Sequence, residues 1–225
     1  MRNKITASIY WIVGLIHLFT VYRHGEFPEM ELYSKAALMP ILLFTCFSLK
    51  NRAVRNVGIP VILALFFSWI GDLVLTNEEF FLYGLGAFFL AHAFYIFSFT
   101  KSNFDNHEVA LIHKAPIFML LFVFFGGMMF FYLKPNLGEM ILPVIAYIGI
   151  IIGMNIAALN RYKKVNDLSF WLIMIGAIFF LISDSIIAIN KFDHLIDNAS
   201  VYIMFTYILA QFLIVQGTLK RIDEV

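Results

Sequence analysis

The sequence predicts an all-α membrane protein, a bundle of eight transmembrane helices that forms one domain over residues 1–225. The 225 residues are 61% hydrophobic and only 14% charged, and 26 of them are Phe, which is too apolar for a soluble domain. The apolar residues gather in eight stretches, each close to the ~20 residues that cross ~30 Å of hydrocarbon. The connections are short, so neighbouring helices are expected to run antiparallel in one compact bundle.

Each of the eight predicted spans has features of its own. The first begins close to Met1 and lacks a small-residue cleavage site, so we interpret it as a retained span and not as a removed signal peptide. The second contains Cys46, the single cysteine, which we expect to be a small core residue. The fifth carries Gly126 and Gly127, which favour close helix packing. In chain order the spans are 5–22, 34–49, 57–75, 80–99, 115–133, 140–159, 168–189 and 199–219.

The Lys and Arg residues predict the orientation of the bundle. One side of the membrane receives twelve of them and the other side only four, which are Arg23, Lys35, Lys134 and Lys191. This bias places both termini in the cytoplasm. We therefore expect an integral, multi-pass protein surrounded by lipid bilayer, in a bacterial inner membrane. No basic patch suggests a nucleic acid partner.

An internal repeat is suggested when Asp72 is aligned with Asp184. Four spans and four spans then form two halves of the same orientation, related by a pseudo-twofold axis along the membrane normal. Such matches also arise by chance in a chain rich in Phe and Ile, so both explanations stay open. The agreement covers residues 67–75 with 179–187, Phe80 with Phe192, and Tyr95 with Tyr207.

Asp72 and Asp184 are the main candidate site residues, because both lie deep in apolar runs. A carboxylate in a membrane-spanning helix costs several kcal/mol unless it is protonated, paired or facing water. Counted at 1.5 Å per residue, both lie ~22–24 Å from the inner ends of their helices, so we expect them to meet. The alternative is that each aspartate only holds helices together.

Further polar residues are expected to share a pocket with the two aspartates. Apart from Lys35, each lies next to one of the aspartates, or three or four positions from another polar residue on the same helix face. Lys35 is expected at the outer rim of this pocket. The alternative is that this lysine, near the end of a span, only extends its ammonium to the membrane surface. An interhelical hydrogen bond is the alternative role for His92, and also for Asn155 and His17. The predicted substrate-binding residues are Lys35, Ser68, His92, Tyr95, Ser183, Tyr207 and Gln211.

The chemistry that these residues favour is acid and base catalysis by two carboxyls. Neither a G-x-S-x-G nor an H-E-x-x-H motif occurs, and only His17 and His92 fall within spans, too few for a three-His zinc site. We therefore expect neither a metal nor a cofactor. Two carboxyls in one low-dielectric pocket do not both ionise readily, so one is expected to act as acid and the other as base. This arrangement suits a reaction through an oxocarbenium-like cation.

At these residues the chain resembles the YhhN family of lysoplasmalogenases, integral membrane hydrolases of the vinyl ether bond in lysoplasmalogens. The resemblance covers nearly the whole chain, and its short G-D and S-D motifs are specific only in combination. The chain departs from the family at Lys35-Ala36, where the family often has Lys-Pro, although Pro40 is retained. The segments that carry the resemblance are 64–75, 84–95, 176–184, 190–192 and 207–211.

The resemblance implies a lysophospholipid substrate, 1-alkenyl glycerophosphocholine or glycerophosphoethanolamine, cleaved to a fatty aldehyde and the glycerophospho-base. One aspartate would protonate the vinyl carbon, and the other would stabilise the cation and take a proton from water. Asp184 is favoured as the acid because its neighbours are slightly more apolar. Lys35 would meet the lipid phosphate, and the other predicted residues would position water or the head group.

Two competing functions also explain paired intramembrane carboxylates. A proton-coupled transporter of a small or lipid-like solute would use them for ion coupling, although no broken helix occurs in corresponding positions of both halves. A non-catalytic lipid-binding or assembly protein would use them only to hold helices together.

Overall fold

The computed structural model describes residues 2–23, 25–47, 54–101 and 116–222. These ranges contain eight α-helices and no strand, which confirms the predicted all-α class and the number of helices. Two predicted span ends, Leu49 and Ala115, lie outside the described residues. The helices are α1 (Arg2–Tyr22), α2 (Pro28–Phe47), α3 (Val54–Val74), α4 (Phe81–Lys101), α6 (Ile117–Leu133), α7 (Ile141–Leu159), α8 (Asp167–Phe192) and α9 (Ala199–Ile222). Short 3₁₀ turns precede α4 and α7.

The lengths and surfaces of these helices suit a membrane. α3 adds a shorter apolar stretch, Gly58–Val74, and α2 carries three charged residues in its first half. Large apolar side chains face outward, such as Phe124 and Phe131, which are 73% and 70% exposed and would meet lipid. The protein is therefore an integral, multi-pass membrane protein. Six described stretches are long and apolar enough to cross a membrane: Lys4–Tyr22, Glu78–Lys101, Ile117–Asn136, Gly138–Leu159, Asp167–Phe192 and Ala199–Arg221.

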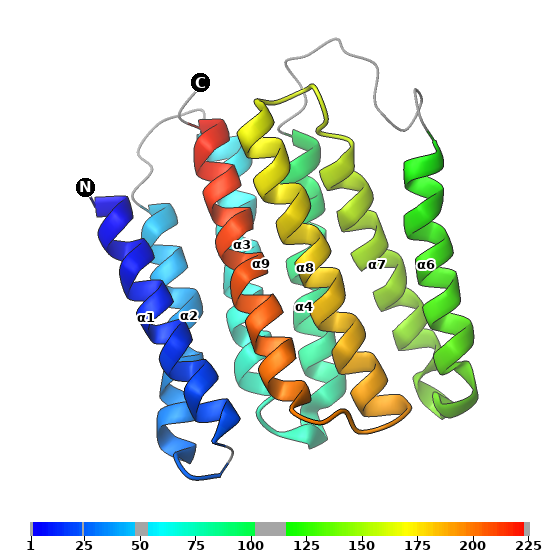
Figure 1. Ribbon diagram of the computed structural model, residues 1–225. Helices are drawn as coiled ribbons and strands as arrows, with labels where there is room; N and C mark the ends of the chain where they lie inside the picture. The colour runs from blue at the N-terminus through cyan, green and yellow to red at the C-terminus, as the bar shows by residue number, and fades with distance from the viewer. Residues whose placement is uncertain (1, 24, 48–53, 102–115, 223–225) are drawn as a thin grey trace.

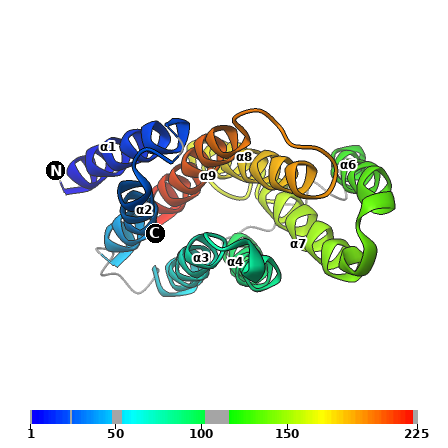
Figure 2. The same ribbon diagram turned by 90° about the horizontal axis from the view of Figure 1, so that it is seen from below.

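The helices form an elongated bundle with two layers at its middle (Figures 1 and 2). α8 packs against α9 in one layer, and α3 packs against α4 in the other. α1 and α2 flank one end of this centre, and α6 and α7 flank the other. The start of α1 and the end of α9 lie at the same end of the bundle (Figure 1). Which side of the membrane this end faces stays a prediction, as does the sequence repeat.

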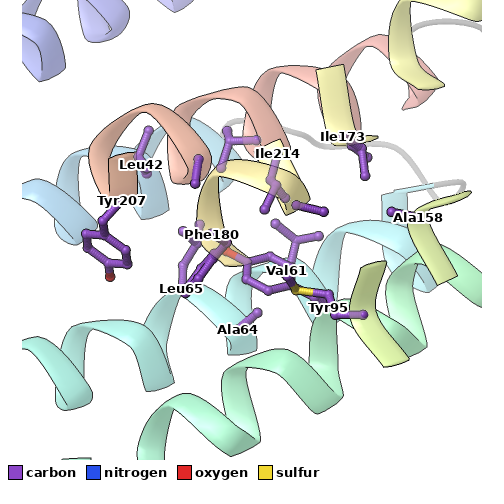
Figure 3. Packing of buried hydrophobic residues seen from close by; sticks show 14 of the residues in the cluster. Leu42, Val61, Ala64, Leu65, Tyr95, Ala158, Ile173, Phe180, Tyr207 and Ile214 are labelled. Atoms are coloured by element: carbon purple, nitrogen blue, oxygen red, sulfur yellow. The ribbon is translucent and has the colours of Figure 1, made fainter. Parts of the chain in front are cut away.

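The core is centred where α8 and α9 meet α3 and α4. Figure 3 shows Phe180 of α8 between Tyr207 of α9 and Tyr95 of α4. Ring centroids lie 5.5 Å apart for Phe180 and Tyr207, and 6.4 Å apart for Phe180 and Tyr95. All three side chains are buried. This aromatic packing fixes α8 against both neighbouring helices.

Glycines allow α8 and α9 to approach closely. A Cβ atom on Gly176 would lie 3.0 Å from the Ala210 carbonyl oxygen, and one on Gly217 would lie 3.1 Å from the Ile173 nitrogen. In α6 the same test shows that Gly126 packs against α7, as predicted, whereas Gly127 has nothing within 4 Å. The close-packing role predicted for Gly127 was therefore wrong, because that face of α6 points away from the bundle.

Candidate functional site

Asp72 lies in the last turn of α3 and is 3% exposed. Its Oδ2 accepts a hydrogen bond of 2.8 Å from the Tyr207 hydroxyl on α9. One turn earlier, the Trp69 indole donates to the Ala36 carbonyl on α2 at 2.8 Å, which ties α2 to α3 at this level. Lys35 directly precedes Ala36, so it lies on α2 at the level where this bond ties α2 to α3. The structure therefore brings together Asp72 and Tyr207, two of the predicted site residues.

Asp184 lies in α8, with a side chain that is 10% exposed. Its Oδ2 accepts a hydrogen bond of 2.7 Å from the hydroxyl of Tyr147 on α7. The Nε2 of His92 on α4 lies 3.6 Å from the same oxygen. Sequence reasoning missed Tyr147, because a single tyrosine in an apolar span has no polar neighbour at helical spacing to mark it.

The hydrogen bonds of His92 determine which of its ring nitrogens faces Asp184. The Nδ1 atom lies 2.6 Å from the Phe88 carbonyl oxygen, which only accepts, so Nδ1 is the donor. In a neutral ring the Nε2 atom then carries a lone pair, and it has no hydrogen-bond partner within the described part of the chain. A lone pair facing an ionised carboxylate is repelled by it. A proton on either group removes this repulsion, so the geometry suits a pair that shares one proton.

A third polar network joins Ser68, Tyr95 and Gln211, all of which are buried. The Tyr95 hydroxyl donates to Gln211 Oε1 at 2.5 Å, and Gln211 Nε2 donates to Ser68 Oγ at 3.0 Å. The sequence assigned these three residues to one pocket, and the structure brings them together. Ser68 lies one turn from Asp72 on α3, and Gln211 lies one turn from Tyr207 on α9. Ser183, beside Asp184, donates to the Ile203 carbonyl at 3.1 Å and so links α8 to α9.

Aromatic rings connect the surroundings of the two aspartates. The Phe180 ring contacts His92 at 4.7 Å and Tyr207 at 5.5 Å between centroids, so it touches one partner of each aspartate. Each aspartate is thus contacted from the last helix of the other half of the chain: Asp72 from α9 and Asp184 from α4. That the two carboxyls act as a pair stays a prediction.

An apolar cavity has Asp184 in its wall. Its cavity volume is about 70 Å³, and further space beside it is open to the outside of the bundle. Its walls come mostly from α4, α6, α7 and α8, and most of its lining side chains are apolar. Tyr147, Asp184 and Ser185 are the polar residues among those that line it, and Asp72 is not among them. The cavity therefore places the Asp184 carboxyl in an otherwise apolar wall.

Grouped metal ligands are not found in the described ranges, where no three His, Cys, Asp or Glu side chains are placed to hold an ion. The polar groups that meet at the Asp184 carboxyl are an imidazole and a phenol. All three exchange protons, so the arrangement is equipped for proton transfer.

Comparison with known proteins identifies the family. The model of the YhhN family matches residues 30–218, a range that includes both aspartates. The chain belongs to the YhhN family. The resemblance drawn from the sequence is therefore confirmed.

Relatives of this YhhN chain carry the name lysoplasmalogenase. The human protein named Lysoplasmalogenase TMEM86B is 32% identical over 213 residues, which cover 93% of this chain and 87% of the relative. The rat protein of the same name is 31% identical over 213 residues, which cover 93% of this chain and 84% of the relative. The bovine protein named Lysoplasmalogenase TMEM86A is 29% identical over 171 residues, which cover 73% and 67%. No solved structure matches this chain.

Proposed function

We propose that this YhhN protein is a lysoplasmalogenase-like hydrolase. Its substrate is 1-alkenyl glycerophosphocholine or glycerophosphoethanolamine, and its products are a fatty aldehyde and the glycerophospho-base. The names of relatives about 30% identical over most of the chain support this assignment. The single observation that carries it is an apolar cavity with the Asp184 carboxyl in its wall.

The cavity orients the alkenyl chain more than it attracts it. A hydrocarbon chain that leaves lipid for an apolar cavity exchanges one apolar medium for another, so burial alone gains little free energy. The polar groups at Asp184 and Tyr147 therefore fix the position of the chain by meeting the vinyl ether. Such placement supplies catalysis by orientation, which does not require tight binding.

Asp184 is the proposed acid. Its carboxyl proton passes to the vinyl carbon remote from oxygen, the double-bond electrons form the new C–H bond, and an oxocarbenium ion remains. Water adds to the cationic carbon and loses a proton, which gives a hemiacetal. The hemiacetal breaks its bond to the glycerol oxygen, which is released as an alcohol, and the fatty aldehyde forms.

The neighbours of Asp184 support the acid role. His92 Nε2 lies 3.6 Å from the Asp184 oxygen, close enough to return a proton to Asp184 after each turnover. Tyr147 donates to the carboxyl at 2.7 Å and holds its orientation. An acid that must give its proton to carbon benefits from this fixed geometry.

Asp72 is the proposed anionic partner. Tyr207 holds the orientation of this carboxyl with a hydrogen bond of 2.8 Å. In a low-dielectric interior its negative charge stabilises a cation formed on the other side of the aromatic cluster. The proton that the attacking water loses passes to Asp184, which is a carboxylate once it has protonated the vinyl carbon.

Aldehyde release from lyso-alkenyl lipid by the purified protein, in the presence of EDTA, tests this function. Wild type is expected to release aldehyde, whereas D184N and D72N are expected to lose at least about a hundredfold in rate while remaining folded. Full activity of D184N would refute the acid role. A folded wild type that releases no aldehyde would refute the function itself.

A further inference from the structure

Lys191 lies at the end of the cavity-lining face of α8. It follows Asp184 by seven residues, almost two full turns, so both side chains project from the same face about 10 Å apart along the axis. Ala188 and Phe192, which flank Lys191 on this face, line the cavity. The Lys191 ammonium also lies 5.4 Å from the ring centroid of Phe81, another lining residue. A cation is therefore placed at the rim of the cavity.

The present partner of this cation is easily replaced. Lys191 Nζ lies 2.9 Å from an Oε2 of Glu78, whose side chain is 88% exposed, whereas that of Lys191 is 35% exposed. An ion pair in contact with water contributes little to stability, because solvent screens both charges. A phosphate that approaches this rim can take the place of Glu78 at little cost.

We propose that Lys191 binds the phosphate of the lysophospholipid while the alkenyl chain occupies the cavity beside Asp184. This assignment rests on the proposed function. Six single bonds separate the cationic carbon from phosphorus, roughly 7 Å at the ~1.2 Å per bond of an extended chain. The spacing of about 10 Å along α8, together with the flexible lysine side chain, accommodates that length.

Lys35 is the competing cation, since the sequence assigns the phosphate to it. It lies on α2, a helix that contributes no residue to the cavity lining. The residues beside it on α2 contact other groups: Ser34 contacts His17, and the Ala36 carbonyl accepts from Trp69, one turn before Asp72. We therefore assign Lys35 to the charge balance of Asp72, and Lys191 to the head group.

Binding of uncleavable ligands tests this assignment separately from turnover. The ligands are a saturated 1-O-alkyl glycerophosphocholine, its phosphate-free 1-O-alkylglycerol counterpart and inorganic phosphate. The proteins are wild type, K191M, K35M and E78Q in nanodiscs, each checked for helicity and thermal stability. We expect K191M to weaken binding of the phospholipid about tenfold, as for loss of one charge-assisted contact, and to leave the alkylglycerol unchanged. E78Q, which breaks the same ion pair but retains the cation, is expected to bind the phospholipid at least as tightly as wild type.

Several results would overturn the assignment. A selective loss in K35M but not in K191M would move the phosphate to Lys35. Equal losses in K191M and E78Q, or for both lipids, would leave Lys191 as a structural tie. Binding of inorganic phosphate as tight as that of the phospholipid would indicate a site for free anions. Aldehyde release by wild type is measured in parallel: its absence refutes the proposed function, whereas the binding data decide the role of Lys191.

Discussion

Tyr147 donates its hydroxyl hydrogen bond to Asp184 across the interface of α7 and α8, with 2.7 Å between the two oxygens. Both residues line the apolar cavity. The bond holds the carboxyl at one orientation in the cavity wall, and the Nε2 atom of His92 faces the same oxygen. The proposed acid is therefore positioned by two helices besides its own.

The change Tyr147→Phe removes this donor and keeps the ring. We expect the rate of aldehyde release to fall about tenfold to a hundredfold, because a hydrogen bond to a carboxyl contributes roughly 1.5–3 kcal/mol. Tyr10→Phe is the matched control, since Tyr10 donates to the Ile208 carbonyl at 2.9 Å and does not line the cavity. Y10F should lower thermal stability and leave the rate per folded molecule unchanged. Equal rate losses in both variants would contradict the role of Tyr147.

His92→Ala is expected to lower kcat by at least about tenfold with little change in KM, because the ring moves a proton and does not hold the lipid. Steady-state kinetics on aldehyde release measure both constants. His17→Ala is the control: His17 is also buried, but its Nδ1 bonds to Ser34 of α2 at 3.0 Å, away from the cavity. A rise in KM with unchanged kcat in H92A would assign His92 to binding instead.

Filling the cavity should change which chain lengths are accepted. Ala188→Phe places a large ring in the cavity wall, so we expect KM to rise more for long alkenyl chains than for short ones. Ile182→Phe is the control on the same helix, because Ile182 is 41% exposed on the outside of the bundle. Competition between long and short substrates reports the preference directly. An A188F variant with the chain-length profile of wild type would show that the chain lies elsewhere.

The contact between α8 and α9 should depend on a glycine. Gly176→Ala forces a Cβ to 3.0 Å from a backbone oxygen of α9, so we expect the midpoint of thermal unfolding in detergent to fall by several degrees, for a cost of about 1–3 kcal/mol. Gly127→Ala adds the same methyl group where nothing lies within 4 Å, and should unfold like wild type or slightly later. If both variants unfold at the same temperature, close packing at Gly176 is not what holds α8 in place.

Hydropathy predicted the fold because the bundle consists of apolar segments separated by short polar connections. Asp72, Asp184 and His92 were also evident from the sequence, because titratable residues are rare inside apolar runs. The grouping of Ser68, Tyr95 and Gln211 followed from helical spacing alone. These features all depend on position along one helix.

What the sequence left open depends on how the helices are rotated about their axes. In a membrane, helices are apolar on nearly all sides, so hydropathy does not indicate which face meets a neighbour. The bond from Tyr147 to Asp184 and the place of Phe180 between the partners of the two aspartates are set by that rotation. For the same reason, the sequence pointed to Lys35 as the phosphate ligand, whereas the position of the cavity leads us to propose Lys191.

Cleavage in D₂O tests whether Asp184 delivers its proton to the vinyl carbon. The fatty aldehyde is trapped as it forms, and its mass is compared with that of the same aldehyde incubated in D₂O without protein. We expect one deuterium on the carbon next to the carbonyl in the wild-type product, and no product above background from D184N. Aldehyde formed without deuterium at that carbon, or formed equally by D184N, would contradict it.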